Sequence, residues 1–479
     1  MTGVLSDKYD AVVIGSGPNG LSGAIRLARA GLSVIVLEAN ETIGGGLRSA
    51  ELTLPGFVHD CCSAVHPLAI GSPFLRSLKL EKNGLAWLQP QLPLAHPLEG
   101  GRAAALHRSV LATSAGLGRD QHNYQGLMAP LLSNWEKSAT EFLQPILHIP
   151  DRPLMLAQFG WRSFRSAESL VKAWFKTDEA RALFGGLAAH SFLPLERVPS
   201  AAFGIVLAMM GHAVGWPSPR GGSQQIANAL AQLLESLSGK IVTGRRVGRL
   251  EQLPPSRVVL FDVSPRQVLS LAGNRLPGWY RRALERFHHG PGVFKIDYAL
   301  SQPIPWSAEE CRMAGTVHVC GSFEEVAAAE RRVAQGEHPE RPFVLLAQPT
   351  LFDPTRAPQG KHIAWAYCHV PQGSSVDMTT RIENQIERFA PGFRDLVLAR
   401  HTADCRQLEL GNANLVGGSI DGGTTDLRQL LARPVFSSAP YRIPVKGWYL
   451  CSASTPPGGG VHGMCGLHAA ELALDDWFG

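Results

Sequence analysis

The pattern of apolar and polar positions predicts an alternation of strands and helices at the start of the chain. Tyr9 to Ile14 form an apolar run typical of a buried strand, and Ser33 to Leu37 form a second one. Between them, Leu21 to Ala30 place their apolar side chains at helical spacing. Strand, helix and strand in this order form the first unit of a doubly wound parallel sheet, so we expect an α/β fold.

The same pattern continues along the chain. Helical spacing occurs at 168–175, 180–189, 226–234 and 461–477. Short apolar or β-branched runs predict strands at 240–244, 246–251, 256–262, 292–298, 343–347 and 363–367. The later strands suggest a second sheet that forms a floor beneath a bound cofactor.

Three glycines stand in the turn between the first strand and the first helix, as Gly15-x-Gly17-x-x-Gly20. Gly15 permits a tight turn, Gly17 lets backbone N–H groups approach a pyrophosphate, and Gly20 lets the helix pack close to the strand. The helix N-terminus presents free amides to the anion, and Pro18 and Asn19 at its start are further candidate cofactor contacts. A glycine-rich turn without a ligand is the alternative, and the complete strand–turn–helix–strand context disfavours it.

An acidic residue and a second glycine cluster follow. Glu38 ends the second strand, 18 residues after Gly20, and Ala39 follows it. A carboxylate at this position can accept hydrogen bonds from ribose hydroxyls and would repel the 2′-phosphate of NADP. The run 43–49 then reads Ile-Gly-Gly-Gly-Leu-Arg-Ser. Such a run suggests more backbone close to a larger cofactor, a flavin dinucleotide. Its candidate contacts are Gly45, Gly46, Leu47 and Arg48.

These motifs resemble the FAD-dependent amine-oxidase/phytoene-desaturase superfamily. Within it, the chain is most similar to the phytoene-desaturase-like group that contains the pyridine nucleotide-disulfide oxidoreductase domain-containing protein 2 family. The C-terminal stretch 447–466 resembles that group's terminal flavin motif, and 414–423 with Arg433-Pro434 and Pro440-Tyr441 resembles the segment before it. Many members carry arginine where this chain has Gly46, so Arg48 could take over that contact.

The resemblance implies a fold and a cofactor. The expected fold is a Rossmann-type FAD-binding domain of residues 1–72, 216–275 and 431–479, interrupted by a mixed sheet-plus-helix substrate domain of residues 73–215 and 276–430. The cofactor is non-covalent FAD. Beyond the contacts named above, the resemblance implies Val247 near the adenine and Gly459, Gly460 and Val461 near the flavin ring.

Composition excludes few classes of protein. The chain has 479 residues, 45% of them hydrophobic, and a formal net charge of +5 without a block of like charges. Nucleic-acid binding therefore gains little support. The eight cysteines show no metal-ligand or C-x-x-C spacing, so we expect reduced thiols, no metal and a reducing compartment.

The N-terminal residues 1–7 show no apolar signal segment, which favours a cytoplasmic protein. Contact with a membrane surface stays open, because Ala201 to Trp216 are apolar around the whole circumference of a helix and yet too few to span a bilayer. This segment is either a buried core helix or the wall of an apolar tunnel or membrane contact.

No conventional catalytic triad or metal motif occurs, as expected where a flavin carries the chemistry. His66 is the best catalytic candidate among His59, His66, His462 and His468, and Asp421 is either an acid–base group or a turn former. The turn 455–458 has no aromatic residue, which argues against amine oxidation. No second glycine unit for NAD(P) occurs, so the electron acceptor is oxygen, a quinone or a partner protein.

We therefore expect an FAD-dependent oxidoreductase that transfers hydride to flavin from an apolar, lipid-like or polyene small molecule. Two alternatives stay open. One is a redox-neutral polyene cis–trans isomerase that uses reduced flavin. The other is a flavin-bearing protein whose main role is interaction with other proteins.

Overall fold

The N-terminal unit folds as the pattern predicts. In the computed structural model, which describes residues 7–133, 135–145 and 150–478, strand β1 (Ala11–Ile14) runs parallel to β2 (Val34–Leu37), and helix α1 (Pro18–Arg29) connects them. All residues of both strands are buried. Side chains of both faces are covered by other layers, which is why these strands read as continuous apolar runs.

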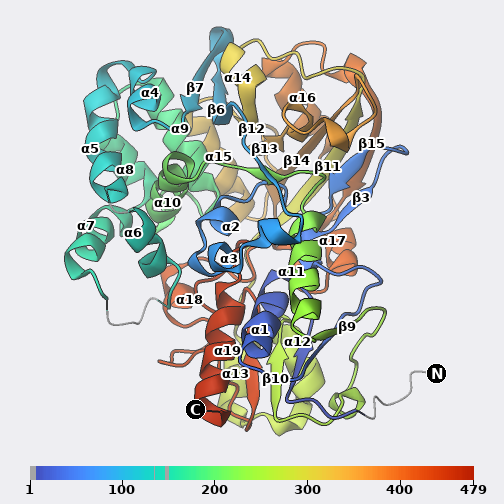
Figure 1. The fold of residues 1–479 in the computed structure, drawn as a ribbon. Helices are drawn as coiled ribbons and strands as arrows, with labels where there is room; N and C mark the ends of the chain where they lie inside the picture. Colours follow the sequence, from blue (N-terminus) through green and yellow to red (C-terminus); the bar gives the residue numbers. More distant parts are fainter. Residues whose placement is uncertain (1–6, 134, 146–149, 479) are drawn as a thin grey trace.

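Five parallel strands form the first sheet, in the lower half of Figure 1. Their order is β16 (Trp448–Leu450), β10 (Val258–Phe261), β1, β2 and β9 (Lys240–Val242). Helix α1 packs against α11 (Gln224–Ser236) and α19 (Met464–Trp477), while α12 (Pro265–Ala272) and α13 (Gly278–Glu285) share a separate apolar cluster with β10. The carboxyl ends of parallel strands meet at one edge, where this fold type binds its ligand.

A seven-stranded sheet occupies the upper half of Figure 1. Neighbouring strands are antiparallel except for β12 and β6, which are parallel. The strand order is β15 (Val397–Ala403), β11 (Gly292–Leu300), β14 (His362–Val370), β13 (Val344–Ala347), β12 (Ala314–Val319), β6 (Leu92–Leu98) and β7 (Arg102–Leu106).

Helices cover this second sheet on both sides. Helix α16 (Thr379–Phe389) packs on the apolar cluster of β11, β13 and β14, and α15 (Phe323–Ala334) packs against α9 (Asp178–Ala189). A lobe of helices adjoins α9 on the left of Figure 1. It comprises α4 (Val110–Ala115), α5 (Gln121–Leu132), α6 (Trp135–Phe142), α7 (Pro153–Ser163), α8 (Ala167–Trp174) and α10 (Ser200–Ala213).

The expected fold class, a Rossmann-type sheet combined with a mixed sheet and helices, is confirmed. The strand expected at 246–251 is wrong: β9 ends at Val242 and β10 begins at Val258. Between them, the partly buried side chain of Val247 packs against two apolar clusters. The last helix begins at Met464, not Val461, because Gly463 has a left-handed φ of 69°. The domain boundaries stay a prediction, and residues 1–6 lie outside the described part of the chain.

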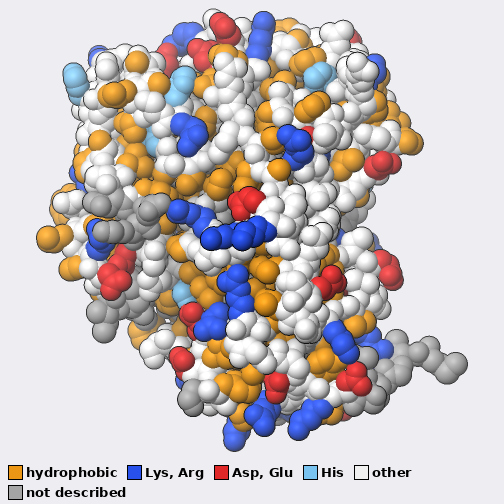
Figure 2. All heavy atoms as spheres, viewed as in Figure 1, with side chains coloured by type: hydrophobic (Ala, Val, Ile, Leu, Met, Phe, Trp, Pro, Cys, Tyr) orange, Lys and Arg blue, Asp and Glu red, His pale blue; other side chains and the backbone are white. Residues whose placement is uncertain are grey.

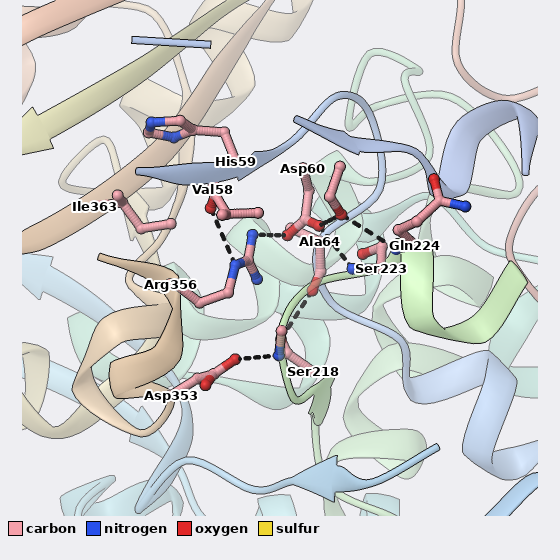
Figure 3. Close-up of polar contacts among 12 residues, drawn as sticks. Val58, His59, Asp60, Ala64, Ser218, Ser223, Gln224, Asp353, Arg356 and Ile363 are labelled. Carbon is pink, nitrogen blue, oxygen red and sulfur yellow. Dashed lines mark hydrogen bonds and ion pairs between the residues drawn. The ribbon is translucent and has the colours of Figure 1, made fainter. Parts of the chain in front are cut away.

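A buried ion pair joins the segments around the two sheets (Figure 3). Arg356 donates from Nη2 to Asp60 Oδ2 at 2.9 Å and from Nε to the Val58 carbonyl at 3.0 Å. Both side chains of the pair are 1% exposed. Asp60 Oδ1 accepts from the hydroxyl of Ser49 at 2.7 Å and from the backbone N–H of Ser223 at 2.8 Å. Asp60 thus joins β4 (Val58–Asp60) to Arg356 on one side and to Ser223, at the start of α11, on the other.

Removal of one partner of this pair should strongly destabilise the protein. In Arg356→Met, the Asp60 carboxylate stays buried without its cation, and we expect a loss of about 3–5 kcal/mol in the free energy of unfolding, measured by urea denaturation. Lys172→Ala, which breaks the exposed Lys172–Glu168 pair, should cost less than about 1 kcal/mol. Equal losses in the two variants would contradict this expectation.

The destabilisation should also depend on pH. Burial by itself raises the pKa of Asp60, but Arg356 and the hydrogen bonds from Ser223 and Ser49 outweigh burial and lower this pKa below 3.8. The pair therefore stabilises the fold above about pH 4, and this contribution disappears as pH falls through the lowered pKa.

Candidate flavin-binding site

The glycine loop is packed against an aspartate at the end of β10. Gly20 donates its N–H to Asp262 Oδ2 at 3.0 Å, and a Cβ added at Gly17 would lie 2.6 Å from the same oxygen. A Cβ at Gly20 would lie 2.2 Å from the carbonyl oxygen of Gly15. The structure therefore leaves no room for a side chain at Gly17 or Gly20, and the glycines keep the loop backbone open to a ligand.

Asp262 carries an unusual carboxyl group. Burial raises its pKa well above 3.8, and the nearby charge of Glu38 raises it further, while the Gly20 N–H acts in the opposite direction. Asp262 was not among the residues selected from the sequence. It could have been found, since Asp262 is the last residue of the predicted strand 256–262, and the carboxyl ends of parallel strands meet at the same edge.

Glu38 is held in place by its neighbours. Its Oε2 accepts from the N–H of Ser16 at 3.0 Å and from the Ser16 hydroxyl at 2.6 Å. Its Oε1 accepts from the N–H of Asn40 at 2.9 Å and from the Asn40 side chain at 3.0 Å. The carboxylate is thus fixed at the carboxyl end of β2, next to the glycine loop, and a carboxylate has further lone pairs that can accept from ribose hydroxyls.

One cavity of about 540 Å³ connects this edge of the sheet with the interior of the molecule. Most residues predicted to contact the cofactor line it: Gly15, Gly17, Pro18, Asn19, Glu38, Ala39, Gly45, Gly46, Val247, Gly459, Gly460 and Val461. They come from five separate parts of the sequence, which the fold brings around a single space.

Three predicted cofactor contacts do not line the cavity. Gly20 is enclosed by the backbone of Gly15 and the side chain of Asp262. The side chain of Leu47 is fully buried in the core around α1 and α11. Arg48 donates from Nε to the Gly45 carbonyl at 3.2 Å and from Nη2 to the Gly411 carbonyl. Direct cofactor contacts for these residues stay predictions, and in the structure each has a supporting contact.

His66 lines the cavity, as does His462, whereas His59 and His468 do not. The Ser223 hydroxyl lies 2.6 Å from the Ser63 carbonyl, which can only accept, so this hydroxyl donates there. His66 Nε2, 2.7 Å from the same hydroxyl, must therefore carry the hydrogen, and Nδ1 keeps its lone pair. Burial lowers the pKa of His66 to about 4, so the ring is neutral at pH 7.

The inner part of the cavity is bounded by apolar side chains. Helix α10 contributes Phe203, Val206 and Leu207, and the seven-stranded sheet contributes Leu345 and Trp365. Further lining residues from other segments are Phe192, Trp216, Ile420, Leu415 and Leu430. A wall at 201–216 was one of two alternatives for that segment, and the strands at 343–347 and 363–367 were expected to form a floor beneath the cofactor. Which of their side chains face the cavity was not predicted, because a strand far along the chain gives no local sign of what it faces.

The sulfur atoms near the C-terminal glycines do not reach the cavity. Cys451 and Cys465 are fully buried and lie outside its lining. Cys465 lies 3.4 Å from the Thr455 carbonyl. All eight cysteines are free, and Cys62 is the one that lines the cavity in the described part of the chain.

Comparisons with known proteins agree with this geometry. The NAD(P)-binding Rossmann-like domain matches residues 13–75. The rat pyridine nucleotide-disulfide oxidoreductase domain-containing protein 2 is 26% identical over 99% of this chain and 94% of its own length. A limonene dehydrogenase chain from Castellaniella defragrans is 22% identical over 98% of this chain and 95% of its own.

Among solved structures, an oxidoreductase from Methanosarcina mazei superposes with a TM-score of 0.66 at 17% identity, over 98% of this chain and 100% of that one. Putrescine oxidase is a further match among solved structures, and a phytoene desaturase from Fusarium fujikuroi is a further match by sequence. The expected resemblance to the amine-oxidase/phytoene-desaturase superfamily is confirmed. The matched relatives include enzymes named as a dehydrogenase and as desaturases, which agrees with the expected class, an FAD-dependent oxidoreductase.

Glu38 should be necessary for cofactor retention. Glu38→Ala removes a charged acceptor for two ribose hydroxyls, each such bond contributing about 1.5–3 kcal/mol, so FAD should bind at least about 100-fold more weakly. The measurement is the FAD dissociation constant by fluorescence. Glu41→Ala, an exposed carboxylate three residues away, should bind FAD like the wild type. Unchanged affinity in Glu38→Ala would contradict the predicted contact.

Proposed function

We propose that the protein oxidises an apolar small molecule by dehydrogenation or desaturation, with FAD bound along the glycine loop. A flavin supplies an acceptor for an electron pair, and the protein positions it and admits the substrate. One observation carries the proposal: the cavity that begins at the carboxyl edge of the five-stranded sheet continues directly into a chamber with apolar walls.

The residues that would hold FAD follow from their positions. Gly15, Gly17 and the start of α1 would bind the pyrophosphate, and Glu38 a ribose. Val247, which lines the cavity, would lie near the adenine, and Gly459 and Gly460, which also line it, would lie near the flavin ring. Helix α19 begins shortly after these glycines, so its N-terminal partial positive charge would stabilise negative charge on a reduced ring.

The inner chamber suits a substrate without charge. Its His190 side chain contacts His318 at 2.9 Å, and burial lowers the pKa of His190 to about 3, so the ring is neutral at pH 7. Apolar pockets with few polar groups bind ligands that bury most of their surface. The name of the limonene dehydrogenase chain, similar over nearly the whole length, indicates a hydrocarbon substrate for that protein and supports an apolar class here.

Anaerobic bleaching of the flavin tests the proposal. The reconstituted protein is mixed without oxygen with limonene, phytoene and putrescine in turn. We expect an apolar compound to bleach the flavin absorbance and putrescine not to do so. A protein that cannot retain FAD, or one bleached only by the amine, would contradict the proposal, and isomerisation only after prior reduction would favour the isomerase alternative.

Two substitutions on α10 separate a chamber wall from ordinary core. Leu207 lines the cavity, whereas Met209, on the same helix, is fully buried in the apolar core and does not line the cavity. Leu207→Glu should abolish bleaching by the apolar compound and retain FAD and most of the melting temperature. Met209→Glu should lower the melting temperature strongly, because an unpaired buried charge costs several kcal/mol. Equal unfolding of both variants would contradict the assignment of the wall.

Contact with a membrane surface is a second part of the proposal. Within residues 7–133, 135–145 and 150–478, no helix combines the length and apolarity needed to cross a bilayer. Helix α7 and the residue after it expose Leu154, Trp161 and Phe164 by 81%, 84% and 62%. Arg162 and Arg165 are neighbours of these apolar residues in the sequence. Figure 2 shows the face on which α7 lies, where apolar, basic and acidic side chains are mixed. A surface with this composition suits an anionic lipid interface.

Replacement of the exposed tryptophan should weaken such an interaction. Trp161→Ala should reduce co-sedimentation with phosphatidylserine-containing vesicles, while Trp279→Ala, a 56% exposed tryptophan on α13, should not. Equal sedimentation of wild type and Trp161→Ala would contradict the membrane contact.

A further inference from the structure

Asp421 stands where the cofactor part of the cavity meets the apolar chamber. It lines the cavity together with Ile420 and Gly422. A Cβ added at Gly459 would lie 2.7 Å from the carbonyl oxygen of Asp421 and 3.2 Å from its Cα. The backbone of Asp421 therefore packs directly on the glycines predicted to approach the flavin ring.

One oxygen of the Asp421 carboxyl group has no hydrogen-bond partner. This oxygen, Oδ2, is buried. The nearest cation, Arg433, does not use its N–H groups on this carboxyl: Nη2 donates to the backbone carbonyls of Asp421 at 2.8 Å and of Ala453 at 2.9 Å, and Nη1 donates to the carbonyl of Thr424 at 3.1 Å. A buried polar group with an unused acceptor is costly, and such groups concentrate at functional sites. The turn-forming role considered from the sequence does not explain this arrangement.

The other titratable groups around Asp421 are fixed in one protonation state or engaged elsewhere. Burial raises the pKa of Tyr367 far above its usual value and that of Cys62 to about 11, so both stay protonated. His369 contacts Glu330 through Nδ1 at 2.8 Å. For Asp421 itself, burial raises the pKa to about 7, and His369 and Arg433 act in the opposite direction. Its carboxyl group can therefore change protonation near neutral pH.

We propose that Asp421 is the catalytic base that accepts the proton released when the substrate is dehydrogenated. This inference rests on the proposed function. Loss of two hydrogens from adjacent carbons releases a hydride and a proton. The hydride goes to the flavin of the proposed function, which is reduced. The electron pair of the second C–H bond forms the new double bond, and its proton goes to the ionised carboxylate of Asp421, which becomes a neutral acid. The substrate is thereby oxidised by two electrons.

A pH titration of the oxidised holoprotein tests the position of Asp421 without a substrate. The flavin absorption spectrum is recorded from about pH 5 to about pH 9. We expect a spectral shift with an apparent pKa near 7 in the wild type, its loss in Asp421→Asn, and its retention in Asp426→Asn. Asp426 is a matched control, because it caps α18 (Leu427–Leu431) from outside the cavity and Asn is an equally good cap.

The outcomes distinguish this inference from the proposed function. A wild type that binds FAD but shows no shift, or a shift that persists in Asp421→Asn, overturns the role of Asp421 and leaves the proposed function standing. A wild type that binds no FAD overturns the proposed function. If Asp421→Asn does not fold, Asp421→Glu, which keeps the carboxyl, should still show a shift, and its absence there also overturns the inference.

Stopped-flow bleaching by the apolar compound provides the second measurement. The rate should rise with pH through about 7 in the wild type, because only the ionised carboxylate accepts a proton. In Asp421→Asn it should fall by about 10²–10⁴-fold and lose this pH dependence, with FAD affinity unchanged. An unchanged rate in a variant that retains FAD contradicts the proposal.

Discussion

The buried pair of Asp60 and Arg356 is the interaction on which the site depends most. Asp60 lies at the end of a short strand, just before the segment that lines the cavity with Cys62, Ser63 and His66. Arg356 lies between strands of the other sheet. A charge pair in a dry interior is stable only with good geometry and further hydrogen bonds, and here Ser49 and Ser223 supply them. The two sheets are thereby held in one relative position around the cavity.

A chain of hydrogen bonds extends this constraint to the site. Ser223 donates its backbone N–H to Asp60 and its hydroxyl to the Ser63 carbonyl. The same hydroxyl contacts His66 Nε2 and so fixes the tautomer of that ring. Ser218 donates to the carbonyl of Ala64 at 2.8 Å on the same loop (Figure 3). The loop before α2 (Pro67–Gly71) is therefore anchored at several points, which restricts its movement beside the cavity.

Three carboxyl groups differ in what surrounds them. Glu38 accepts four hydrogen bonds from two neighbouring residues and serves as a fixed anchor. Asp262 supports the glycine loop through one backbone N–H. Asp421 lines the cavity, and its buried Oδ2 has no hydrogen-bond partner. In the proposed function, the same functional group would thus serve a ligand contact, a backbone conformation and proton transfer, because its partners differ at each position.

The sequence by itself determined the local elements and the cofactor loop. The runs 11–14 and 34–37 are buried strands, and their continuous apolar residues show this in the sequence. The spacing of Gly15, Gly17 and Gly20 likewise predicts the loop, because the turn that it forms depends on neighbouring residues alone. Only the tertiary structure decided which side chains meet. The partners of Asp60 and Glu330, the burial of Asp421 and the face of α10 that lines the chamber depend on segments tens to hundreds of residues apart. Neither helical nor strand periodicity carries information about such distant partners, so burial, and with it the chemistry of a carboxyl group, could be known only after the chain had folded.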